Sequence, residues 1–204
     1  AYDPWIPLFA EQLPGLVAAQ ARIPDESRAK AVALLAGWDH RWSLTSTETS
    51  LAVFWADALW ERVAAAAGVP LAPMQQGLMV QASEAEKLAA LDAAIARLKA
   101  DFGSWQVPWG EINRFQRLDG AIVRTFDDAK PSIPVPFVAA NGGSLASFGA
   151  QRYPGTRRYY GDYGNSFVAV VEFGPRVHAR AVSAGGLSSD PSSPHFNDQA
   201  KRYA

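Results

Sequence analysis

Cysteine is absent from this sequence of 204 residues. Its absence excludes a disulfide framework, a thiolate zinc site and a cysteine nucleophile. It is compatible with the cytoplasm or the periplasm and does not distinguish between them. Long apolar runs are also missing, since none approaches the roughly 20 residues that span a bilayer. The first residues lack the basic segment and apolar stretch of a signal peptide.

A strong excess of one charge is missing as well. The net charge is −1, so no long-range field attracts nucleic acid or an anionic membrane, and neither is expected as a partner. Five arginines between Arg152 and Arg180 make the second half locally basic, which is typical of solvated strand faces. The hydrophobic fraction of 49% is ordinary for a globular protein and sufficient for a sizeable core in one or two domains.

The first half of the chain is predicted to be helical after a start interrupted by prolines. The run from Arg28 to Trp38 is rich in alanine and leucine. Thr45 and Glu48 have the spacing of a capping box. The residues after them recur on one helical face, and Gly68 with Pro70 is expected to end this helix. The face comprises Leu51, Phe54, Trp55, Ala58, Leu59 and Val63.

A second capping box, Ser83 with Glu86, opens another predicted helix. Its apolar residues also recur at helical spacing, and Gly103 stands at its C-terminal end. The face comprises Leu88, Leu91, Ile95, Leu98 and Phe102.

The pattern changes after Trp109. Segments 121–126 and 131–137 are expected to be extended or irregular. Residues 166–173, SFVAVVEF, are β-branched and aromatic, and residues 177–183 alternate as a paired strand does. Gly174 and Pro175 between them supply a turn, so these residues predict a β-hairpin. The tail, residues 185–199, is dense in Gly, Ser, Pro and Asp and is predicted to be a loop.

These patterns predict an α+β fold with a mainly helical segment, 1–115, and a β-rich segment, 116–204. The second segment offers too few strands to form a sheet with covered edges, and an exposed edge beside SFVAVVEF would favour aggregation. We therefore expect its strands to join a sheet formed by other polypeptide.

Three histidines limit the possible chemistry: His40, His178 and His195. No HExxH motif occurs and no two histidines are close in sequence, so a zinc site has little support. Asp190, His195 and Asp198 have the residue types of a metal site or an acid–base pair. Aspartates in such a loop more often form Asx-turns and caps, and this interpretation is favoured.

For the other candidate functional residues, a structural role is the favoured interpretation. Segment 141–144, NGGS, has the composition of a phosphate-binding or oxyanion loop, but it lacks the Walker lysine, and a plain turn is favoured. Asp127 with Asp128, and Glu84 with Glu86, are adjacent carboxylates without an apolar setting, so we expect solvated or capping groups.

Tryptophan is abundant, with seven residues. Trp105, Trp109 and the pair Trp38 and Trp42 have side chains that can stack on a ligand. Burial in a core or a subunit interface is the favoured interpretation of these residues.

Three stretches together resemble the C-terminal region of the β-subunit in the penicillin acylase family. The most specific comprises residues 164–173, GNSFVAVVEF, and 186–199, GLSSDPSSPHFNDQ, which match the family's GNS-strand and QSSDP-x-SPH-[YF]-x-DQ pattern. Residues 102–114 contain a segment similar to the family's WG-[ED]-[VI]-[HN]-R, and residues 34–39 resemble its L-x-x-W-[DN] helix end. Their order and spacing agree over nearly the whole chain, and acyl-homoserine-lactone and lipopeptide acylases are the most similar members.

The resemblance implies an N-terminal-nucleophile hydrolase with an αββα sandwich, of which this chain would form the C-terminal portion. It implies a precursor exported to the periplasm and cut autocatalytically into α and β subunits. The new N-terminal serine of the β-subunit would be the nucleophile and its own amine the base. The implied substrate is a small linear amide, the implied partners are the remaining α- and β-subunit polypeptide, and no cofactor is implied.

Several residues depart from the family pattern. Ala1 has no hydroxyl and cannot be the nucleophile, and the pair Gly103 and Ser104 does not match the processing junction. Asn165 belongs to the GNS motif and not to the position of the oxyanion asparagine, and Leu187 stands where glutamine is common. We therefore assign no catalytic, cofactor-binding or metal-binding residue to this chain.

Three hypotheses follow. The first is a structural segment of an amide hydrolase that releases an acyl chain from an amine-bearing core. The second is a free-standing binding or structural module with a tryptophan-lined groove. The third is an independent enzyme centred on His195 and Asp198.

Overall fold

The computed structural model describes residues 7–68, 81–119, 125–139 and 146–204. These residues form two compact units, one from the described residues up to Trp109 and one from Gly110 onward. Ala1, Pro70, most of segment 121–126 and the NGGS segment lie outside the described residues. No helix in the described ranges has both the length and the apolar character needed to cross a membrane.

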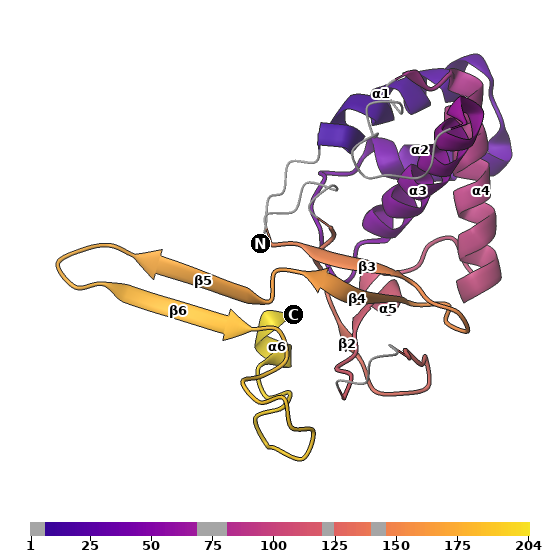
Figure 1. The fold of residues 1–204 in the computed structure, drawn as a ribbon. Helices are drawn as coiled ribbons and strands as arrows, with labels where there is room; N and C mark the ends of the chain where they lie inside the picture. The colour runs from indigo at the N-terminus through magenta and orange to yellow at the C-terminus, as the bar shows by residue number, and fades with distance from the viewer. Residues whose placement is uncertain (1–6, 69–80, 120–124, 140–145) are drawn as a thin grey trace. The chain divides into compact units, whose positions relative to one another are not determined.

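The first unit consists of helices, and α3 and α4 lie side by side in it (Figure 1). α1 and α2 complete it, α1 contacting both α2 and α4. The helices are α1 (Pro7–Arg22), α2 (Glu26–Ala36), α3 (Thr47–Ala67) and α4 (Glu84–Phe102).

The two predicted capping boxes have different outcomes. Ser83 and Glu86 form the predicted box, with each side chain bonded to the other residue's backbone N–H. The prediction for Thr45 is wrong, because α3 begins one residue later and Ser46 Oγ accepts from Thr49 N at 3.0 Å. Gly68 and Gly103 end α3 and α4 as predicted. Both adopt left-handed backbone conformations, with φ of 65° and 80°, which glycine reaches without steric cost.

Helix α1 forms in the proline-interrupted start, where no helix was predicted. Pro7 is its first residue, a position where the missing N–H has no cost. Pro14 lies inside the helix on its exposed side, while Leu13 and Leu16 are buried. Burial of this leucine face outweighs the lost backbone hydrogen bond.

The core of the first unit lies between α3 and α4. Trp55 is fully buried, and its Nε1 donates to Lys87 O at 3.0 Å. The predicted faces are confirmed, since most of their members are buried. Buried Arg28 of α2 reaches Asp92 of α4 with an Nη1–Oδ2 distance of 2.7 Å and so connects the two helices.

The second unit contains a four-stranded sheet in the order β2-β1-β4-β3. β1 and β4 are parallel, and the other pairs are antiparallel. The short helix α5 (Trp109–Ile112) leads directly into this sheet. The strands are β1 (Asn113–Phe115), β2 (Ile133–Pro134), β3 (Phe148–Arg152) and β4 (Tyr159–Gly164).

Two glycines give aromatic rings room on β3 and β4. The Tyr163 ring occupies the space that a Cβ on Gly149 would need, and the Phe148 ring does the same at Gly161. Phe148 also packs with Val135 and Tyr203 in the core of this unit. These rings cover the glycine backbone, so larger residues at either position would displace them.

The predicted hairpin is confirmed as β5 (Phe167–Glu172) and β6 (His178–Ser183), a separate two-stranded antiparallel sheet (Figure 1). Strand alternation gives it two different faces. One carries Phe167, Ala169 and Val171, paired in register with Ser183, Ala181 and Ala179. The opposite face begins with Val168 and Val182, which pack on the core of the unit, and ends with charged and polar residues.

The tail is an irregular loop, as predicted, followed by the short helix α6 (Ala200–Tyr203). Tyr203 and Ala200 of α6 are buried. The chain is therefore an α+β protein, as predicted. The division into 1–115 and 116–204, and the sandwich architecture, stay predictions.

Candidate functional site

The terminal loop brings His195 and Asp198 together. His195 Nδ1 lies 2.9 Å from Asp198 Oδ2. Asp190 does not join them, because its Oδ1 accepts from the backbone N and the hydroxyl of Ser192 in an Asx-turn. The His195 side chain is 69% exposed. The pair thus lies in water, where neither group is shielded in the manner of a catalytic acid or base.

Close backbone packing holds this loop together. Ser188 N donates to His195 O at 3.1 Å. A Cβ on Gly186 would collide with His195 O, so the loop can close on itself only with glycine there. The arrangement fixes the loop and leaves His195 and Asp198 on its surface.

Gln199 joins the loop to the hairpin. Its Oε1 accepts from Ser183 N at 2.9 Å, and its backbone N donates to Gly185 O at 2.7 Å. A side-chain-to-backbone brace therefore connects the loop to the end of β6, and Gln199 provides it. The Asp190 carboxylate stabilises a turn within the loop.

The GNS motif anchors the other strand of the hairpin. Asn165 Oδ1 accepts from Ser147 N at 2.6 Å and from Ser147 Oγ at 3.1 Å. The Tyr203 hydroxyl donates to Asn165 O at 2.7 Å. Asn165 therefore connects the start of β5 to the residue before β3 and to α6, which is a structural role.

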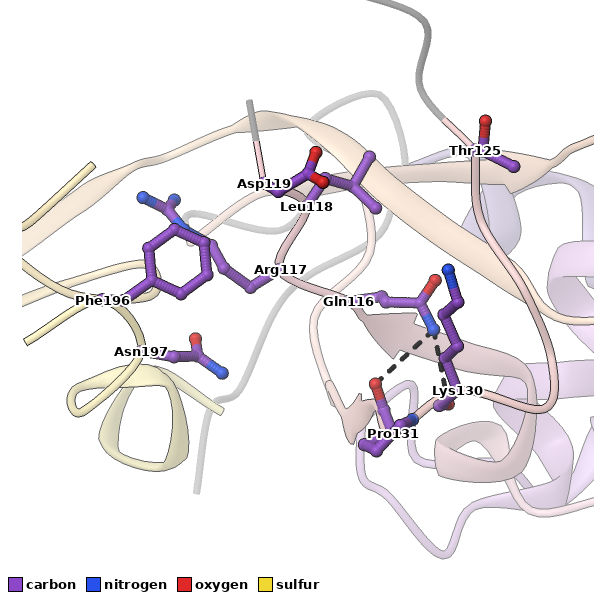
Figure 2. Close-up of a pocket in the computed structure, with 9 residues that line it drawn as sticks. All are labelled: Gln116, Arg117, Leu118, Asp119, Thr125, Lys130, Pro131, Phe196 and Asn197. Carbon is purple, nitrogen blue, oxygen red and sulfur yellow. Dashed lines mark hydrogen bonds between the residues drawn. The ribbon is translucent and has the colours of Figure 1, made fainter. Parts of the chain in front are cut away.

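A pocket of about 450 Å³ lies beside the loop, and sequence reasoning did not identify it. Figure 2 shows the side chains around it, which come from the segment after β1, the segment before β2 and the terminal loop. Its lining residues are Gln116, Arg117, Leu118, Asp119, Thr125, Lys130, Pro131, Phe196 and Asn197.

Gln116 forms the rigid part of this pocket. It is buried, its Nε2 donates to Asp127 O at 2.9 Å, and its Oε1 accepts from Asp127 N at 3.0 Å. These bonds fix the segment that carries Lys130 and Pro131 against the segment that carries Arg117.

Arg117 is held between a ring and a glycine. Its guanidinium carbon lies 4.9 Å from the centre of the Phe196 ring, as Figure 2 illustrates. Its Nη1 would lie 3.1 Å from a Cβ on Gly185, whose φ of 91° also favours glycine. Arg117 and Phe196 are far apart in sequence, and no motif connects them. Only the folded loop brings them together.

Asp128 is not a solvated group, which corrects the prediction for Asp127 and Asp128. Its carboxylate accepts from the Tyr160 hydroxyl at 2.9 Å and from Arg157 N at 2.8 Å. Burial alone would raise the pKa of Asp128, but these bonds and Arg158 lower it below its ordinary value. Asp127 behaves as predicted, because its Oδ1 caps the turn at Ala129 N.

The pKa of Tyr160 is shifted in the opposite direction, upward. Burial, and then the bond to Asp128, raise the pKa of its hydroxyl to about 12. This network connects the segment before β2 to β4 and is structural. Glu84 and Glu86 are confirmed as groups at the start of α4, where Glu84 pairs with Arg22 and Glu86 completes the capping box.

The histidines do not form a common site. His40 packs edge-on against Trp38, with ring centroids 5.2 Å apart, and His178 lies exposed on β6. Among the residues that the structure describes, no three His, Asp or Glu side chains gather as metal ligands. In the same ranges, no serine or threonine hydroxyl is hydrogen-bonded to an imidazole ring.

Three of the four tryptophans considered as ligand-stacking residues are buried, as the favoured interpretation predicted. Trp38, Trp42 and Trp109 are buried, at 7%, 6% and 2% exposure, so they do not line an open groove. Trp105 is half-buried.

A comparison with known families gives a match over the whole chain. The family model described as penicillin amidase matches residues 1–204, the whole of the chain.

Proposed function

Because the chain belongs to the penicillin amidase family, we propose that it is a structural segment of an amide hydrolase whose nucleophile lies on other polypeptide. Family membership makes the complete protein an acylase-type amidohydrolase. Within that enzyme, this chain would complete and stabilise the sheet that supports the active site.

The apolar face of the hairpin carries the proposal. Along it run Phe167, Ala169 and Val171, and opposite them lie Ser183, Ala181 and Ala179. Phe167 is 62% exposed and Val171 is 43% exposed. A face this apolar is seldom left in water, because burying it is favourable and exposing it promotes association. The opposite face also exposes one valine, Val170, but beyond it carries Glu172, Arg180 and His178, so the end of that face is charged and polar.

The chemistry of the described residues agrees with this assignment. Acyl transfer needs a nucleophile, a base within hydrogen-bonding distance and donors for the oxyanion. Among the described residues, His195 and Asp198 are the histidine–carboxylate pair, and they lie in open solvent with no hydroxyl on the ring. The hydrolase hypothesis therefore places the nucleophile elsewhere and makes the loop a brace.

The sequence motifs shared with the family support a more detailed proposal for the complete enzyme. The complete enzyme would be an N-terminal-nucleophile hydrolase of the periplasm with an αββα sandwich, formed by autocatalytic processing. A serine hydroxyl, activated by its own α-amine, would attack the amide carbonyl, release the amine and leave an acyl-enzyme that water hydrolyses. The substrate would be a small linear amide of the β-lactam, acyl-homoserine-lactone or lipopeptide type, and the partners would be the remaining polypeptide of the precursor.

The test is to express the complete reading frame and substitute one residue on each face of the hairpin. Val171→Lys places a charge on the apolar face, and Glu172→Lys makes the matched change one residue away on the polar face. Co-purifying polypeptides are identified by intact mass, and amide hydrolysis is followed by release of a primary amine.

We expect Val171→Lys to reduce both co-purification and amidase activity by at least about tenfold, because a buried lysine opposes assembly. Glu172→Lys should retain both. If Val171→Lys assembles and hydrolyses amides as the parent does, the hairpin face is not an interface and the proposal is wrong.

A further inference from the structure

One wall of the pocket is the Arg117 guanidinium, which contacts the Phe196 ring but has no anionic partner among the described residues. Arg117 Nε is buried without a hydrogen-bond acceptor, and no ion pair among the described residues involves this side chain. The Phe196 ring and Gly185 fix the plane of the guanidinium. Arg117 as a whole is half-buried, and its terminal nitrogens stay accessible, so they can meet a ligand in the pocket.

From this geometry we propose that the pocket binds a small monocarboxylate with an apolar tail. The planar guanidinium offers its terminal nitrogens in a fork that matches a carboxylate. Nε is inaccessible, so the ligand oxygens would meet the terminal nitrogens.

The charges of the pocket favour a single negative charge on the ligand. Arg117 and Lys130 are cations and Asp119 is an anion, so the lining has a net charge of about +1. A phosphate dianion would leave one negative charge without compensation by this lining. The single negative charge of a monocarboxylate is balanced by the net charge of Arg117, Lys130 and Asp119.

The other residues that line the pocket are suited to the apolar tail of such a ligand. Leu118, Pro131 and Phe196 supply apolar surface, and Asn197 and Thr125 add polar groups. The volume of about 450 Å³ lies in the range of small-molecule sites. The site does not include the hairpin face or the nucleophile, so it is independent of the hydrolase proposal.

The experiment is calorimetric titration of the complete gene product at low salt with hexanoate and with hexanamide, its neutral isostere. Three variants are compared: Arg117→Gln, Arg117→Lys and, as a control, Arg176→Gln at the exposed tip of the hairpin. The thermal midpoint of each variant is measured to establish that it is folded.

We expect the parent to bind hexanoate and to bind hexanamide at least about tenfold more weakly, because the charge-assisted bonds are lost. Arg117→Gln should weaken hexanoate binding by at least about tenfold, Arg117→Lys should weaken it less, and Arg176→Gln should leave it unchanged. Added salt should weaken binding. No hexanoate binding to the folded parent, equal binding of the amide, or unchanged binding to folded Arg117→Gln would each overturn the site.

Discussion

Tyr160 and Asp128 show how single residues hold the second unit together. The Tyr160 hydroxyl is buried and donates to the Asp128 carboxylate, which also accepts from Arg157 N. Each group shifts the pKa of the other away from its ordinary value, in opposite directions. Because a shifted pKa is a difference in proton affinity between folded and unfolded chains, this pair makes stability depend on pH.

The dependence of stability on pH is easiest to predict at alkaline pH, where Tyr160 ionises. The pKa of Tyr160 is raised from 10.0 to about 12 on folding, so the folded state holds this proton more strongly. The resulting stabilisation is complete below pH 10 and is lost as pH rises towards 12. Tyr160→Phe removes the ionisable hydroxyl, so its free energy of unfolding should fall less steeply over that range. At neutral pH it should lose about 1.5–3 kcal/mol of stability, because the hydroxyl donates to an ionised carboxylate.

The measurement is denaturant unfolding of parent and variant from pH 8 to 11.5, with the second unit followed by hydrogen exchange of β4. Tyr163→Phe is the matched control, because the Tyr163 side chain is 64% exposed. Parallel pH profiles for the parent and Tyr160→Phe would show that the buried hydroxyl does not couple to folding.

At the scale of the element, the sequence was most informative about the ends of α3 and α4 and about the hairpin. Gly68, Gly103 and Ser83 act locally, so their roles were predictable without the fold. The cap of α3 was misplaced by one residue because Thr45 and Ser46 are both good caps, and spacing alone favoured the wrong one.

The four-stranded sheet was not predicted, for two physical reasons. β1 and β2 are very short, and β1 pairs in parallel with β4, so their stability comes from distant partners. Gly149 and Gly161 suggest loops in a sequence, yet here they sit under the rings of Tyr163 and Phe148. The contact between Arg117 and Phe196 was missed for the same reason, because it depends on tertiary structure.

The brace between the terminal loop and β6 makes a prediction at this scale. Gln199→Ala removes the acceptor of Ser183 N and should speed hydrogen exchange along the last residues of β6, with a loss of about 0.5–1.5 kcal/mol. Asp190→Ala should affect the loop turn and leave β6 exchange unchanged, since its carboxylate bonds to Ser192. Exchange mass spectrometry compares the two variants. Equal effects on β6 would contradict the role of Gln199.

At the scale of the whole molecule, the family was predictable from its long C-terminal motif, whose residues now have structural roles. Asn165 ties the hairpin to Ser147, Gly186 permits the loop to close, and Gln199 holds β6. These roles concern the support of a sheet. No catalytic residue was predicted, because none of the matching stretches contains a residue that fits the family's nucleophile, and in the described residues no serine or threonine hydroxyl is bonded to an imidazole ring.

The central claim is that other polypeptide of the same precursor covers the apolar face of the hairpin. The absence of cysteine from the chain allows a direct test, since Ala169→Cys puts a single thiol of this chain in the middle of that face. Ser189→Cys, in the exposed terminal loop, is the matched control.

Maleimide labelling of each variant in the complete native enzyme is mapped by peptide mass spectrometry. The account predicts rapid labelling at residue 189 and at least about tenfold slower labelling at residue 169 until the enzyme is denatured, because a covered thiol is inaccessible. Equal labelling rates at the two positions in an enzyme that hydrolyses amides would contradict it.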